Sequence, residues 1–222
     1  MKYHISMYLC GRPAVIDPEN PEVVWNCFFE ALEGYVWADH CKESRSQSYA
    51  WGPGAPGLVL PPGVGYKVGG SFGVNYIVLA IHYETITPAM LSGKETDNSG
   101  LILHMTSVPQ NENVDMIVDM SFGLIPPHSI GNNDIICRLE ESFTIHPIKY
   151  MIHMHMHGVS VTIRKEDGAN RQLTLLDKKM NDPTTINDLD PFPDQDIWMR
   201  KGDRLIITCT HNNTWSHPMQ LG

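Results

Sequence analysis

Proline and glycine interrupt this chain so often that long helices are excluded over most of its length. The 222 residues include 16 prolines and 18 glycines, and the apolar runs between them are short. Proline lacks a backbone donor and glycine adds conformational freedom, so both residues disfavour helices. The short apolar runs have the length and composition of strands; they cover residues 65–70, 75–83, 100–108, 114–124, 150–163 and 203–211. The sequence therefore predicts an all-β fold.

One segment could be helical. Residues 20–37 read NPEVVWNCFFEALEGYVW, with Asn20 in the N-cap position and Pro21 at the first helical position. We expect two domains, because a polar stretch, SVPQNENVD at 107–115, separates two β-rich halves. The expected organisation is two antiparallel β-sandwich domains, residues 1–110 and residues 111–222.

The net charge of the chain argues against a nucleic-acid partner, and its hydropathy shows no membrane-spanning segment. The formal net charge is −9, whereas a nucleic-acid-binding protein needs a clustered basic face. No apolar run approaches the roughly 18 residues of a membrane helix, so membrane attachment is not visible. The first residues, MKYHISMYLCG, have no signal-peptide pattern.

The stretch YMIHMHMHGVSVTI, residues 150–163, alternates histidine with methionine. In a strand, side chains two residues apart share a face. His153, His155 and His157 would then point one way, and Ile152 and Met154 the other. Two imidazoles at this spacing can converge on one copper or zinc ion, with a third ligand from another strand. The alternative is an exposed polar face opposite a core lined by methionine.

Several segments, taken in order, resemble the copper type II, ascorbate-dependent monooxygenases. They are YAWGPGAPGLVLPPGVGYKVGG (49–70), YIVLAIHY (76–83), SGLILHMTSVPQ (99–110), YMIHMHMHG (150–158) and GDRLIITCTHNNT (202–214). The segments look nearest the peptide-hydroxylating branch of that family. The resemblance implies two jelly-roll-like domains, each with one copper ion. One copper takes electrons from ascorbate, and the other activates dioxygen for attack on the α-carbon of the substrate. Copper suits this chemistry and zinc does not, because zinc has no redox chemistry.

The resemblance also implies ligands. The electron-transfer copper of the first domain would be held by His4 and His82; the family has a further histidine beside the first, where this chain has Tyr3. The catalytic copper of the second domain would be held by His153 and His155, while His157 falls at a non-ligand position.

Two departures concern the second site. The family's methionine ligand lies beyond the strand that carries Cys209, and Met219, the late methionine here, is not expected to replace it. The second domain is therefore expected to be incomplete at its end. Met151 stands where the peptide-hydroxylating branch has an arginine that holds the substrate carboxylate, and a thioether offers no charge or donor for that purpose.

The five cysteines fit the same resemblance. Cys10 and Cys41 would form a disulfide, whereas Cys27, Cys137 and Cys209 match family cysteines whose partners lie outside residues 1–222. The chain is thus expected to be a fragment or a shortened form, and its location is expected to be the secretory pathway.

The function implied by the resemblance is hydroxylation of the α-carbon of the C-terminal glycine in glycine-extended peptides, the first step of peptide amidation. Three alternatives stay open. One is a dopamine-β-hydroxylase-like monooxygenase of small molecules, and another is a truncated, non-catalytic copper-binding module. The third is a cupredoxin-like oxidase, which is disfavoured because only Thr210 separates Cys209 from His211 and no histidine precedes them in the required pattern.

Overall fold

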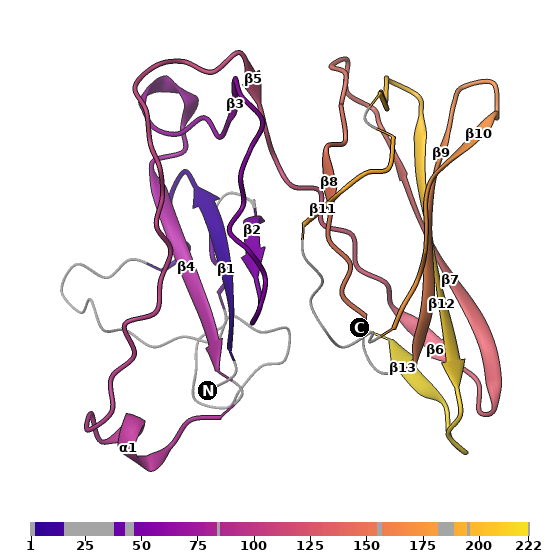
Figure 1. The fold of residues 1–222 in the computed structure, drawn as a ribbon, viewed down its shortest axis with the longest axis horizontal. Coiled ribbons are helices and arrows are strands. Elements are labelled where there is room, and N and C mark those ends of the chain that lie inside the picture. The colour runs from indigo at the N-terminus through magenta and orange to yellow at the C-terminus, as the bar shows by residue number, and fades with distance from the viewer. Residues whose placement is uncertain are drawn as a thin grey trace. The chain divides into compact units, whose positions relative to one another are not determined.

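The computed structural model describes residues 3–15, 38–42, 47–83, 85–154, 157–181, 189–194 and 196–221, with only the backbone of Tyr3 and His4. It is almost entirely β, and its main sheets are antiparallel (Figure 1). The predicted all-β fold is confirmed. Contacts divide the chain into two compact units, Met1–Val118 and Asp119–Gly222. The helix expected over residues 20–37 lies outside the described residues.

The first unit is built on an antiparallel three-stranded sheet, with β1 between β2 and β4. These strands are β1 (Tyr3–Cys10), β2 (Gln47–Trp51) and β4 (Tyr76–Tyr83). Two very short strands, β3 (Val64–Gly65) and β5 (Glu112–Asn113), pair in parallel. A 3₁₀ turn, η1, covers Gly70–Phe72, and the short helix α1 covers Pro88–Leu91.

The residues at the N-terminus of α1 explain why the helix begins there. Thr87 caps it, since its hydroxyl accepts a hydrogen bond from the Met90 N–H at 3.2 Å, and Pro88 occupies the first turn. Among the described residues of this unit, Tyr8, Cys10 and Cys41 form a buried cluster with Val78 and Ala80 packed against it. Other strand residues are also buried: Ile5, Met7, Leu9 and Tyr49.

The second unit contains a four-stranded antiparallel sheet in the order β10–β9–β12–β7. These strands are β7 (Ser129–Arg138), β9 (Gly158–Glu166), β10 (Gln172–Lys179) and β12 (Arg204–Asn213). Two short pairs accompany the sheet: β6 (Gly123–Ile125) with β13 (Met219–Leu221), and β8 (Lys149–Tyr150) with β11 (Asp190–Pro191).

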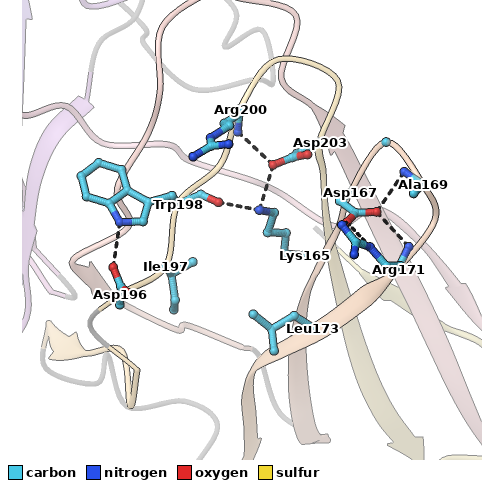
Figure 2. A pocket seen from close by; sticks show the side chains of 11 residues that line it. Lys165, Asp167, Ala169, Arg171, Leu173, Asp196, Ile197, Trp198, Arg200 and Asp203 are labelled. Atoms are coloured by element: carbon cyan, nitrogen blue, oxygen red, sulfur yellow. Dashed lines mark hydrogen bonds and ion pairs between the residues drawn. The ribbon is translucent and has the colours of Figure 1, made fainter.

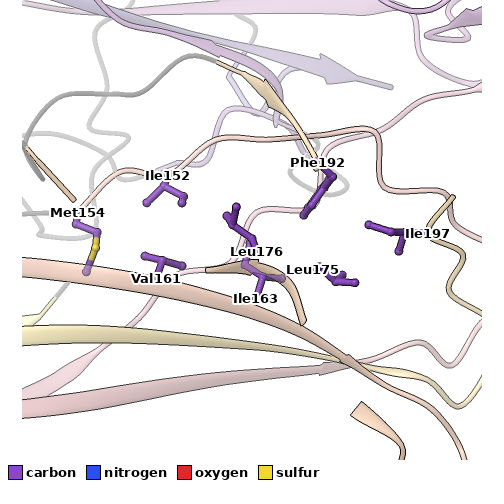
Figure 3. Packing of buried hydrophobic residues seen from close by; sticks show 8 residues of the cluster. All are labelled: Ile152, Met154, Val161, Ile163, Leu175, Leu176, Phe192 and Ile197. Atoms are coloured by element: carbon purple, nitrogen blue, oxygen red, sulfur yellow. The ribbon is translucent and has the colours of Figure 1, made fainter. Parts of the chain in front are cut away.

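The core of the second unit follows from alternation along β9 and β12. Val161 and Ile163 are buried on one face, and Ile207 and Cys209 of β12 pack against the same cluster. Figure 3 shows how the cluster extends beyond the sheet, where its members come from several segments: Ile152, Met154, Val161, Ile163, Leu175, Leu176, Phe192 and Ile197.

The opposite face of this sheet carries many polar side chains, together with Ile206, Ile136 and Ile130. A chain of side-chain hydrogen bonds crosses all four strands: Arg164 donates to Gln172 at 3.3 Å and to Thr208 at 3.1 Å, and Thr208 in turn bonds Asp134 at 2.6 Å. One face therefore packs a core while the other presents polar groups, as in a sandwich layer.

Several predicted strands differ from the structure. Strands were confirmed at 76–83 and 204–213, but residues 101–108 form no strand. Their apolar side chains are largely exposed, with Ile102 at 89% and Met105 at 73%, and a strand without a hydrogen-bonded neighbour gains little. Most of the predicted strand at 114–124 is also irregular, because β6 begins only at Gly123. At 65–70, positive φ angles at Gly69 and Gly70 turn the backbone away after β3.

No helix within the described parts of the chain is both long and apolar enough to span a membrane.

Candidate metal centres

The pairing of β1 with β4 places two of the predicted ligand positions next to each other. His4 is the direct register partner of His82, and Tyr3 is the partner of Tyr83. Directly opposed positions of an antiparallel pair share one face, with Cβ atoms about 4.5–5.5 Å apart. His82 is half-buried. Positions 78 residues apart in sequence (82 − 4) are therefore brought together by the sheet.

The chain beyond β4 is held close to this end of the strand. The Tyr83 hydroxyl donates to Asp97, which also accepts hydrogen bonds from the Ser99 hydroxyl at 2.7 Å and the Ser99 N–H at 3.0 Å. These hydrogen bonds hold the pKa of Asp97 below its ordinary value, and the bond from the Ser99 side chain has the largest effect. Tyr83, Asp97 and Ser99 thus fix the loop that follows the strand carrying His82.

His153 lies in a segment between β8 and β9. Ile152 and Met154 are 7% and 5% exposed and belong to the core, whereas His153 is exposed. The predicted alternation is confirmed for these three residues, although the segment is not assigned as a strand. His155 lies outside the described residues. The buried neighbours anchor the backbone on both sides of His153 and leave its imidazole on the surface.

The alternation does not extend to His157. Its φ is +75°, a left-handed conformation that ends the extended segment before β9 begins. The His157 ring contacts the Trp215 ring edge-on at 4.6 Å between centroids, and Trp215 stacks on His217 at 5.0 Å. A left-handed residue turns the backbone out of an extended course, so the regular two-residue alternation expected over 150–163 ends at His157. The contact with Trp215 gave no sequence signal, since 58 residues separate the two (215 − 157).

Among the side chains that the structure describes, no three histidine, cysteine, aspartate or glutamate groups gather as a metal site. That set omits the side chain of His4 and the whole of His155. The backbone register places His4 opposite His82, and the His153 side chain is exposed. Imidazole is a donor type that suits a copper ion with redox chemistry.

Comparison with known proteins decides the family. The model of the copper type II ascorbate-dependent monooxygenase N-terminal domain matches residues 1–89, and that of the C-terminal domain matches residues 114–222. The chain belongs to the copper type II ascorbate-dependent monooxygenase family. Copper and ascorbate are the cofactors that define this family, with dioxygen as co-substrate.

Curated relatives support the same membership. The chain is 34% identical over 171 residues to the peptidyl-glycine alpha-amidating monooxygenase of Mus musculus, covering 75% of this chain and 17% of the relative. It is 32% identical over 162 residues to peptidyl-glycine alpha-amidating monooxygenase A of Xenopus laevis, covering 72% and 16%. It is also 29% identical over 181 residues to DBH-like monooxygenase protein 1 of Mus musculus, covering 73% and 28%. The chain thus spans about a sixth of the length of the first two relatives.

Within this monooxygenase fold, Met219 has a packing role. It lies in β13 opposite Ile125, is 5% exposed, and forms a small apolar cluster with Ile125 and Leu221. A thioether held in this way contributes burial of apolar surface rather than a ligand.

The cysteines agree with the predicted pairing. Cys10 and Cys41 form a disulfide with a Cα–Cα distance of 5.3 Å, which confirms the expected bridge. Cys137 and Cys209 are free thiols on the neighbouring strands β7 and β12. Their register partners are Leu205 and Asn133, so the two thiols are offset by four residues, roughly 13 Å, which is too far for a bridge between them. Burial raises the pKa of both thiols. Cys27 lies outside the described residues.

A surface pocket of about 490 Å³ lies at the other end of β9 (Figure 2). Lys165 donates to the Trp198 carbonyl at 2.5 Å and pairs with Asp203 at 3.0 Å, while Arg171 pairs with Asp167 at 2.7 Å. Glu166 ends β9 eight residues after Gly158, so the pocket is roughly 25 Å along the strand from the histidine segment. Two ion pairs, Lys165–Asp203 and Arg171–Asp167, neutralise most of the charges that line it.

Proposed function

We infer that the chain is the copper- and ascorbate-dependent monooxygenase portion of an enzyme that hydroxylates the α-carbon of the C-terminal glycine in glycine-extended peptides. The observation that carries the inference is the cross-strand register of His4 with His82, within a chain that matches both domain models of the family. The names of the amidating relatives support a peptide substrate. Because the chain covers only about a sixth of those relatives, the activity and substrate are proposals.

The first copper centre is proposed in residues 1–110, with His4 and His82 as ligands. Both positions lie on one sheet, so a single rigid element sets their spacing. Tyr3 occupies the position where a neighbouring histidine is expected, and a phenol is a poorer donor than imidazole for a copper ion that must change oxidation state. This centre would therefore bind copper with two protein imidazoles and would depend strongly on each of them.

The second copper centre is proposed in residues 111–222, with His153 and His155 as ligands. Bound copper there would supply the redox chemistry that activates dioxygen. The chain's own contribution is positional: buried Ile152 and Met154 lock the backbone so that the exposed His153 ring stays at the surface. Since Met219 is committed to the core, the third ligand of this centre is not assigned within the described residues.

A second candidate substrate class is favoured by one observation. Met151 stands where the peptide-hydroxylating branch has an arginine, and it cannot form a charge-assisted pair with a peptide carboxylate. The DBH-like relative matches 73% of this chain at a comparable identity. A small-molecule amine lacking a carboxylate is therefore the alternative substrate.

The proposed location is the secretory pathway. The Cys10–Cys41 disulfide supports this location, because structural disulfides form and persist in oxidising compartments.

One experiment tests the proposal directly. The chain is loaded with copper, freed of excess metal by gel filtration, and assayed for bound copper and for ascorbate-dependent oxygen uptake. The substrates are a peptide ending in glycine, the same peptide ending in alanine, and phenethylamine. Uptake that needs the glycine peptide supports the proposal, and uptake with phenethylamine alone supports the alternative substrate. Bound copper with no substrate-linked uptake would overturn both and leave a copper-binding module.

His153→Ala and His104→Ala form the matched pair for this experiment. Both histidines are exposed, but His104 lies in the irregular segment 101–108 and is not a proposed ligand. We expect His153→Ala to lose one equivalent of copper together with oxygen uptake, and His104→Ala to retain both.

A further inference from the structure

Asn212, Asn213 and Thr214 form the only Asn-X-Ser/Thr triplet in the 222 residues. Such a triplet is the acceptor sequence for N-linked glycosylation when X is not proline, but a bulky glycan is compatible with the fold only where the asparagine side chain reaches solvent. The triplet spans the end of β12, which finishes at Asn213. The structure therefore decides whether the acceptor is available.

At the end of β12 the Asn212 side chain is exposed and the Asn213 side chain is buried. His211 and Asn213 are 5% and 0% exposed, while Asn212 between them and Thr214 after them are exposed. The buried Asn213 amide donates to three carbonyls, those of Ile125 and Pro126 at 3.0 Å and of His217 at 2.9 Å. The middle residue thus anchors the turn after β12 and keeps the acceptor on the surface.

Asn212 also lies on the polar face of the sheet, away from the core. Its register partner on β7 is Ile130, which is 72% exposed, and the next pair on the same face is Thr210 with Asn132. Ile207 and Cys209 pack on the opposite face. Among the described residues, the Asn212 side chain makes no hydrogen bond, and a substituent on it would displace no packed group.

We propose that Asn212 carries an N-linked glycan on the outer face of the β10–β9–β12–β7 sheet. In the transfer, the Asn212 side-chain nitrogen forms a bond to C1 of the first N-acetylglucosamine. The bond from that carbon to the pyrophosphate of a lipid-linked oligosaccharide breaks, and the amide proton leaves with the lipid pyrophosphate. The glycan begins close to the histidine segment, because the Asn212 N–H donates to the His157 carbonyl at 2.9 Å.

This inference rests on the secretory location in the proposed function, but its test involves no copper, so the two can fail separately. The full chain is expressed in animal cells behind a cleavable signal sequence, and only molecules with a cleaved signal, which have entered the lumen, are analysed. Glycan occupancy is read by peptide mass before and after enzymatic deglycosylation, which converts a glycosylated asparagine to aspartate.

Four variants test whether the glycan depends on the Asn212-Asn213-Thr214 triplet. Thr214→Ser retains the triplet and should retain the glycan, whereas Thr214→Ala and Asn212→Gln should lose it. Gly100→Thr creates a second triplet at the exposed Asn98, and a Cβ added at position 100 meets nothing within 4 Å. A glycan at Asn98 in this variant shows that the expressed chain can be modified. A glycan at Asn212 in the wild-type chain and in Thr214→Ser supports the proposal. An unmodified Asn212 in cleaved molecules, whether or not Asn98 is modified in Gly100→Thr, overturns it.

Discussion

His4 in β1 lies directly opposite His82 in β4, and this pairing is the clearest structural support for a copper centre in the first unit. The register continues without a shift from Tyr3–Tyr83 to Cys10–Tyr76, so the two histidine positions are held by the full length of both strands. A rigid pair of strands fixes the separation of the two ligand positions in advance of metal binding.

We therefore expect His82→Ala to remove one copper equivalent without unfolding the chain. His82 is half-buried on β4, which pairs with β1 along its whole length, so the backbone hydrogen bonds of the sheet should survive the loss of the ring. Copper is measured by mass spectrometry after loading, and folding by circular dichroism. His104→Ala is the matched control. A His82→Ala chain with its full copper content would contradict the assignment of the first centre.

The buried carboxylate of Glu166 is expected to stabilise the second unit. Glu166 is 6% exposed, lies opposite Arg204 in register, and forms an ion pair with its guanidinium. It also accepts a hydrogen bond from Gln172 at 2.8 Å. Glu166→Ala should lower the free energy of unfolding by about 2 kcal/mol, because hydrogen bonds to charged groups contribute about 1.5–3 kcal/mol.

The control for this prediction is Glu140→Ala, which removes an exposed partner of Arg138 at 3.4 Å. It should change the free energy of unfolding by about 0.5 kcal/mol or less. Urea denaturation measures both variants. Equal effects of the two substitutions would show that the burial of Glu166 is unimportant.

Two isoleucines of the second unit provide a test of its core. Ile197 is 2% exposed and belongs to the main cluster, whereas Ile136 on β7 is 59% exposed. Ile197→Ala should lower the free energy of unfolding by about 3 kcal/mol, from lost burial and the cavity left behind. Ile136→Ala should cost about 0.5 kcal/mol. Thermal and urea unfolding of the two variants measure the difference, and similar values would place Ile197 outside the core.

The Cys10–Cys41 bridge closes a separation of 31 residues in the first unit. In the chain-entropy account, a loop of this size contributes about 3–4 kcal/mol by restricting the unfolded chain. The Cys10→Ser, Cys41→Ser double variant should lower the unfolding free energy by that amount, as read from denaturant curves. The Cys137→Ser variant, which removes a free thiol, serves as control. An unchanged midpoint in the double variant would show that the bridge does not support the fold.

Alkaline pH should destabilise the first unit through Tyr66. Burial, with a smaller contribution from Asp115, raises the pKa of Tyr66 from 10.0 to about 12, and its hydroxyl donates to the Ser48 carbonyl. The folded state therefore holds this proton more tightly than the unfolded state. Its stabilising contribution is complete below pH 10 and is lost as the pH rises from 10 to about 12.

Absorbance at the tyrosinate band measures this titration. Tyr66→Phe should remove a component that ionises near pH 12. Tyr49→Phe is the comparison, since burial, opposed by a backbone hydrogen bond involving Leu58, also raises the pKa of Tyr49. A late component that survives in Tyr66→Phe and disappears in Tyr49→Phe would assign it to Tyr49 instead.

The regular strands could be predicted where an apolar run also had a neighbour to pair with. Residues 76–83 and 204–213 form β4 and β12, each paired along its length. Residues 101–108 have the same composition but no strand partner within the described parts of the chain, and their side chains are mostly exposed. Composition reports the preference of a segment, and a strand also requires hydrogen bonds from another segment.

The histidine segment also has one part that the sequence could predict and one part that it could not. The burial of Ile152 and Met154 on either side of the exposed His153 follows from local alternation. The position of His157 does not, because its left-handed backbone and its contact with Trp215 depend on a turn 58 residues later in the chain (215 − 157).

By itself, the sequence determined the all-β class, the family resemblance, the Cys10–Cys41 pairing implied by it, and the outward direction of His153. The all-β class and the direction of His153 depend on local properties, namely proline and glycine content and the two-residue period of an extended chain. The Cys10–Cys41 pairing depends on the order of motifs along the chain, through the family that they resemble. Only the tertiary structure decided the cross-strand register of His4 with His82, the commitment of Met219 to the core, and the separate surroundings of His157. Those properties depend on which distant segments pair and pack, and hydrogen bonding and burial choose among the pairings only when the whole chain folds.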